Sequence, residues 1–140
     1  MLNNIPNNLF HSINQFTRHF SKVLNEALVP IGLYSAQWTI VYLLKTNGAA
    51  TQKELSLYLG VEPPTMTRTL ARLEKSGWIT KEIGTDKREK QIILTDASHQ
   101  MYEKWLKTVR ACEEQVLNNI SDREKALILS IISNMNANLL

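Results

Sequence analysis

The chain has 140 residues, of which 44% are hydrophobic and 21% charged, with a net charge of +3. This composition excludes an intrinsically disordered chain, and the length fits one globular domain over residues 1–140. Its apolar runs are far shorter than the roughly 20 residues of a membrane helix, and the first ten residues lack the pattern of a secretory signal. The one cysteine, Cys112, rules out an internal disulfide. We therefore expect a soluble, cytoplasmic protein without a membrane partner.

The excess positive charge is concentrated in the middle of the chain. Between Lys45 and Lys90 there are nine basic and six acidic residues, and the seven basic and seven acidic residues elsewhere cancel. A polyanion such as DNA requires a local basic surface of this kind, although a lopsided solvated surface would give the same count.

The N-terminal third predicts two helices. Apolar residues recur in steps of three and four over residues 9–27, which places them on one helix face, and Pro30 and Gly32 end the helix. A second helix is expected over residues 35–46.

Two shorter helices follow. Thr51 to Glu54 has the form of a capping box, and Gly60 supplies the left-handed position that ends the first helix. Pro63 and Pro64 suit the first turn of the next helix, which is expected to reach Gly77.

The remaining segments predict a hairpin and two helices. Residues 78–83 and 91–94 are rich in β-branched and aromatic residues, and a turn-prone charged segment joins them. A long helix begins at Thr95–Asp96, and a second capping box, Ser121 to Glu124, opens the last helix. The predicted fold class is mainly α with a small β-hairpin wing (α+β): a winged helix-turn-helix over residues 35–94, flanked by helices over 5–30 and 95–140.

The helix after Pro63 has the composition of a DNA-reading helix. Met66, Leu70 and Leu73 fall on one side and can pack inward, while a row of hydroxyl and basic side chains faces the opposite way. Threonine can contact phosphates or base edges, and arginine can bond a guanine edge through two donors. An ordinary solvated amphipathic helix is the competing interpretation.

The hairpin tip favours the DNA interpretation. Arg88, flanked by Lys87 and Lys90, can enter a minor groove, whose negative potential attracts arginine. Asp86 is interpreted as a partner that orients an arginine, or as a turn residue only. The predicted DNA-contacting residues are Gln52, Pro64, Thr65, Thr67, Arg68, Arg72, Lys75, Lys87, Arg88 and Lys90.

Four ordered motifs resemble those of the multiple-antibiotic-resistance regulator (MarR) family. They are Thr67-Arg68 in the reading helix, Leu73-Glu74-Lys75-Ser76-Gly77 at its exit, Asp86-Lys87-Arg88 in the wing and Leu94-Thr95 before the next helix. The resemblance covers nearly the whole chain. It implies a DNA-binding transcriptional regulator, more often a repressor, that forms an obligate homodimer through its first and last two helices. It also implies a palindromic operator with half-sites about one helical turn apart, roughly 34–36 Å.

The resemblance further implies release from DNA by a small aromatic effector, bound between the dimer helices and the reading lobe. The candidate lining residues are His19, Trp38, Tyr42 and Trp105, although aromatic residues at helical spacing are more often core. Peroxide-sensing relatives carry a cysteine near the start of the first helix, whereas Cys112 is in phase with apolar neighbours and predicts a buried packing thiol.

Other functions find little support in the sequence. The three histidines and the cysteine have no metal-ligand spacing, and no phosphate-binding loop or nucleophile motif is present, so we expect no enzyme activity, metal or cofactor. The alternative to DNA binding is a winged helix used for protein–protein contact or dimerisation, which would have no need for the basic helix face and Arg88.

Overall fold

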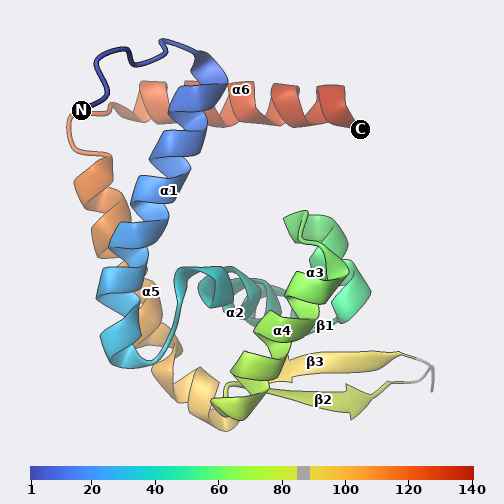
Figure 1. The fold of residues 1–140 in the computed structure, drawn as a ribbon. Helices are drawn as coiled ribbons and strands as arrows, with labels where there is room; N and C mark the ends of the chain where they lie inside the picture. The colour runs from blue at the N-terminus through green and yellow to red at the C-terminus, as the bar shows by residue number, and fades with distance from the viewer. Residues whose placement is uncertain (85–88) are drawn as a thin grey trace. The chain divides into compact units, whose positions relative to one another are not determined.

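A computed structural model describes residues 1–84 and 89–140. Figure 1 shows the elements in chain order. They are α1 (Leu9–Leu28), the 3-10 turn η1 (Val29–Ile31), α2 (Ser35–Asn47), β1 (Ala49–Thr51), α3 (Gln52–Leu59), α4 (Pro63–Lys75), β2 (Ile79–Ile83), β3 (Lys90–Leu94), α5 (Asp96–Val116) and α6 (Asp122–Leu139). The chain forms two compact units, Met1–Val109 and Arg110–Leu140, and each is described by itself.

Both predicted capping boxes are present. The Thr51 hydroxyl accepts a hydrogen bond from the Glu54 backbone N–H at 3.1 Å, while the Glu54 carboxylate accepts from the Thr51 N–H at 3.2 Å. Ser121 and Glu124 repeat the arrangement at 3.1 and 2.9 Å. Each box satisfies two donors that a helix N-terminus otherwise leaves without acceptors, so α3 and α6 begin where the sequence predicts.

Within residues 1–84 and 89–140, the sheet has three strands, one more than the sequence predicted. Its order is β1-β3-β2, with both pairings antiparallel. The missed strand, β1, has only three residues, and it pairs Ala50 with Ile92 and Thr51 with Gln91. Alanine is depleted in strands, and the partner strand lies some 40 residues further along the chain, so no local pattern signals this pairing.

The core of the first unit lies between the sheet and the helices α2, α3 and α4, which are gathered on one side of the sheet (Figure 1). Three side chains of α4, Met66, Leu70 and Leu73, are at most 1% exposed. Ile79 of β2 and Ile92 of β3 are each 1% exposed. The inward side predicted for α4 is therefore confirmed.

Two tryptophans hold the turn after α1. The indole N–H of Trp105 donates to the Ile31 carbonyl and that of Trp78 to the Gly32 carbonyl, both at 2.9 Å. The two indole rings meet edge to face, with centroids 4.9 Å apart. Gly32 has a φ of 90°, and a Cβ there would lie 3.1 Å from the Trp78 ring, so both the backbone and the packing require glycine.

The second unit contains the end of α5 and all of α6. Cys112 is buried, as predicted, whereas α6 has no buried residue within the single chain. The apolar stripe of α6 is exposed instead, with 58% for Leu127, 48% for Ile128, 46% for Ile131 and 45% for Ile132.

Within the described residues, no single helix has both the length and the apolar content to cross a membrane. One pair of helices, Leu9–Ile31 and Ser35–Asn47, meets that test only when taken together and is bent by 75°.

Candidate nucleic-acid interface

Helix α4 is fixed by its buried side and begins in a way that leaves its first turn open. Pro63 and Pro64 occupy the first two helical positions, where the missing N–H groups cost no intrahelical bond. No side chain caps this end, and Glu62, the N-cap residue, is exposed. The start of α4 is therefore accessible, as a helix that enters a groove requires.

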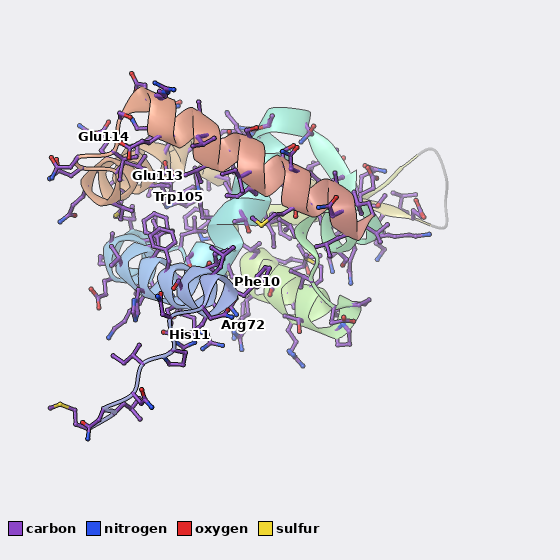
Figure 2. The ribbon with its side chains drawn as sticks, turned by 90° about the horizontal axis from the view of Figure 1, so that it is seen from above. Phe10, His11, Arg72, Trp105, Glu113 and Glu114 are labelled. Atoms are coloured by element: carbon purple, nitrogen blue, oxygen red, sulfur yellow. The ribbon has the colours of Figure 1, made fainter. Side chains whose placement is uncertain are left out.

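The outer face of α4 is basic and exposed. Arg68 donates from Nη2 to the Thr65 hydroxyl at 3.3 Å, which lays the guanidinium along the helix surface. Among the described residues, no carboxylate lies within ion-pair distance of this face. The exposed residues predicted here as DNA contacts are Pro64, Thr65, Thr67, Arg68, Arg72 (labelled in Figure 2) and Lys75.

A hydrogen-bond relay joins α3 to α4. The Thr67 hydroxyl donates its only proton to the Pro63 carbonyl at 2.9 Å, so it must accept in its contact with the Gln52 amide at 2.7 Å. The amide nitrogen of Gln52 is therefore the atom that faces Thr67, which leaves one N–H and the amide oxygen for another partner. This relay holds Gln52 beside the outer face of α4.

The hairpin brings a further predicted contact to the same lobe. Lys90 is exposed and pairs with Ile83 at the last described step of the β2–β3 ladder. Asp86, Lys87 and Arg88 lie outside the described residues, so the wing-tip assignment stays a prediction.

The four residues predicted to line an effector pocket do not share one of the cavities found in the described part of the chain. Trp105, labelled in Figure 2, is fully buried, and Trp38 is 7% exposed and stacks on Tyr102 with ring centroids 5.6 Å apart. Tyr42 instead borders an open groove of about 780 Å³ beside α3, and His19 is exposed. The two tryptophans are core residues in this state of the chain.

Sequence reasoning missed two lysines near the interface. Lys53 and Lys81 lie on a hollow of about 260 Å³ whose other lining residues are Thr51, Gln52, Glu89, Lys90 and Ile92. The strand register could have signalled Lys81, because it pairs with the buried Ile92 and so shares the face of the sheet that turns toward the helices.

The described residues offer no group of three or more histidine, cysteine, aspartate or glutamate side chains that could hold a metal ion. The α4 face and the adjoining hairpin present hydrogen-bonding and positively charged side chains.

Comparison with known proteins identifies the family. The family model of the MarR family matches residues 33–90. A Bacillus subtilis (strain 168) protein described as the uncharacterized HTH-type transcriptional regulator YwoH is 45% identical over 121 residues, which cover 86% of this chain and 88% of the relative. The chain belongs to the MarR family. It is thus a transcriptional regulator by family, as the motifs in α4, the wing and the start of α5 predicted, and its relatives are regulators rather than enzymes.

Solved structures share the fold. MarR from Peptoclostridium difficile DA00132 matches with a TM-score of 0.86 at 23% identity, over 99% of this chain and 92% of that one. A mutant of MarR from E. coli, complexed with operator DNA, matches with a TM-score of 0.83 at 24% identity, over 91% of this chain and 92% of that one. The predicted winged helix-turn-helix fold is confirmed.

Proposed function

We propose that this MarR-family regulator binds double-stranded DNA in the cytoplasm, as a homodimer, and represses transcription from a palindromic operator. The observation that carries the proposal is the outer face of α4, which exposes hydroxyl and basic side chains without a neutralising carboxylate among the described residues. The operator DNA in the E. coli MarR complex, a structure of the same fold, supports the same partner.

The geometry suggests how the sequence is read. With its buried side fixed in the core, α4 enters the major groove, where Arg68 bonds a guanine edge through two donors and Thr65 steadies the guanidinium. Gln52, held by Thr67, contacts the neighbouring backbone or base. Phosphate contacts position the protein, and the arginine specifies the base.

The exposed stripe of α6 supports the dimer. Leu127, Ile128, Ile131 and Ile132 stand at helical spacing on a helix with no buried residue, and a contiguous apolar surface of this kind marks an interaction site. An isologous interface gives the dimer two-fold symmetry, and hence an operator with two half-sites about 34–36 Å apart. Because one reading unit meets only half of this operator, the dimer is the functional unit.

Release by a small aromatic effector completes the proposal. A ligand weakens DNA binding only if it prefers a dimer whose two reading helices have the wrong separation. Tyr42 and His19 are accessible to such a ligand, whereas Trp38 and Trp105 require the core to open. Titration with phenolic acids, followed by tryptophan fluorescence and by loss of operator binding, tests this step.

The central experiment is binding to the DNA upstream of the protein's own gene across a salt series, with random duplex as competitor. Sequence-specific binding should weaken steeply as salt rises, because counterions are released from the DNA on association. Arg68→Ala should cost about 1–3 kcal/mol and relax the preference for one base pair. Arg110→Ala, at an exposed position of α5, is the matched control. A flat salt response, or equal affinity for random DNA, would contradict the proposal and favour a protein-contact module.

A further inference from the structure

The hollow beside the recognition helix has an unusual charge. It lies between the first turn of α3 and the β2–β3 hairpin, has a volume of about 260 Å³, and is lined by three lysines, Lys53, Lys81 and Lys90, and one acid, Glu89. Within the described parts of the chain, none of these lysines lies within 4.0 Å of a carboxylate. The hollow therefore concentrates positive charge that the described residues leave without an ion-pair partner.

The register of the hairpin explains why the lysines face this hollow. Lys81 pairs with Ile92, which is 1% exposed, and paired residues present their side chains on the same face of a sheet. Ile83 and Lys90 form the pair two residues further along, so they share that face as well. The face that buries isoleucine near the helices thus carries lysine further along the hairpin. Inward-pointing charges also protect sheet edges from pairing, but that role does not require a third lysine from α3.

The hollow is continuous with the DNA-reading face. Gln52 lines it and donates to Thr67 on the outer face of α4 at 2.7 Å, so the same side chain borders both surfaces. A duplex whose major groove receives α4 would present its sugar-phosphate backbone beside that helix. Compact ammonium groups are suited to phosphate oxygens as point charges.

We propose that this hollow seats the sugar-phosphate backbone of the operator, with Lys53, Lys81 and Lys90 in contact with phosphate oxygens. The inference rests on the proposed function and adds Lys53 and Lys81 to the interface. The seat contributes affinity that is independent of sequence, because phosphates carry no base identity. Glu89 opposes it: a carboxylate at the edge of the seat repels the backbone and limits binding to random DNA.

The proposal predicts effects of opposite sign within one small site. Lys81→Gln should weaken binding to operator and random duplex by the same factor, and should reduce the salt slope by about two per dimer, one for each half-site. Lys81→Arg should restore both the affinity and the slope. Glu89→Gln should tighten binding to both duplexes. Lys104→Gln, which removes one charge from an exposed position of α5 outside the hollow, should change neither by a comparable amount.

The decisive test combines these variants with operators in which single phosphates are replaced by neutral methylphosphonate. Where Lys81 contacts a phosphate, neutralising that phosphate should cost the parent several-fold in affinity and cost Lys81→Gln almost nothing. Circular dichroism and thermal melting verify that each variant is folded, and Lys81→Arg keeps the readout meaningful if the glutamine variant is unstable.

The possible outcomes separate this proposal from the one on which it rests. The proposed phosphate contact would be wrong if the affinity losses from Lys81→Gln and from neutralising a phosphate were strictly additive at every phosphate and the salt slopes were unchanged. That result would leave sequence-specific binding by Arg68 intact. A parent protein that binds operator and random duplex equally would overturn the specific regulator, yet the coupling between Lys81 and a phosphate could still be measured. A parent that binds no duplex would overturn both.

Discussion

Two amphipathic helices of this protein, α4 and α6, differ in how far the single chain buries their apolar side chains. Helix α4 buries Met66, Leu70 and Leu73 to at most 1% exposure, and its outer face carries exposed hydroxyl and basic side chains. Helix α6 has no fully buried residue within the chain, and its side chains include Leu127, Ile128, Ile131 and Ile132, each about half exposed. Helix α4 thus buries its apolar side within its own chain, whereas the apolar stripe of α6 stays exposed in the single chain. Burying a large aliphatic side chain fully gives about 1.5–3 kcal/mol, so covering these four half-exposed residues offers roughly 3–6 kcal/mol per chain.

The largest effect is expected from a charge on the α6 stripe. Ile131→Asp should prevent dimer formation, because an unpaired carboxylate would have to be buried in the interface. Sedimentation should then give the single-chain mass of 16.0 kDa instead of twice that value. Operator affinity should fall about a hundredfold or more, since the second half-site is no longer bound by a linked reading unit. Ser130→Asp, at an exposed position next to the stripe, is the control. If Ile131→Asp still formed a dimer and bound the operator with the parent's affinity, the α6 stripe would not be the dimer interface.

The next largest effect concerns the buried side of α4. Leu70→Ala removes a fully buried side chain and should lower the free energy of unfolding by about 2–5 kcal/mol. Leu127→Ala, on the exposed stripe, should cost far less at protein concentrations where the chain is monomeric. Urea denaturation of both variants measures the difference. Equal losses would mean that α6 is packed in the monomer after all.

A smaller effect is expected at the start of α3. Thr51→Ala removes the acceptor of the Glu54 N–H and should cost about 1 kcal/mol, as losing an N-cap usually does. Thr108→Ala, whose hydroxyl donates to the Lys104 carbonyl within α5, should cost less. Thermal unfolding of the two variants measures the difference. If Thr51→Ala is as stable as the parent, the capping box does not stabilise α3.

The smallest effect is a pH dependence at the start of α6. Hydrogen bonds from the backbone N–H of Ser121, and then from its hydroxyl, lower the pKa of Glu124 below its ordinary value of 4.5. Because the folded-state pKa is the lower one, the stabilisation is present above about pH 4.5 and is lost as the pH falls through the lowered pKa. The protection factors of the amides in the first turn of α6, which correct for the intrinsic pH dependence of exchange, should therefore fall in acid for the parent and change little for Glu124→Gln, which keeps the hydrogen-bonding shape without the charge. Parallel pH profiles would contradict this assignment.

The elements that the sequence predicted are those specified by near neighbours. The two capping boxes, Gly60 and the Pro63–Pro64 start act over three or four residues, and the structure confirms all of them. Strand β1 was missed because its partner is distant in the chain and because Thr51 is both its last residue and the cap of α3.

The candidate site likewise contains features that the local sequence predicts and features that depend on residues distant in the chain. Helical periodicity predicted which face of α4 is exposed, because that face follows from spacing alone. It could not separate a pocket aromatic from a core aromatic, since Trp38 and Trp105 would show the same spacing in either role. It also overlooked Lys53 and Lys81, which the pairing of β2 with β3 and the position of α3 bring to one hollow.

The turn around Gly32 has a spectroscopic consequence. Two of the three tryptophans of the chain, Trp78 and Trp105, are held to this turn by their indole N–H groups and meet edge to face. Coupled indoles in a fixed, asymmetric arrangement give a near-ultraviolet circular dichroism signal that depends on their mutual angle. A rearrangement of this turn that changes the angle between the two indoles therefore alters the signal, so near-ultraviolet circular dichroism can follow the junction without an added label.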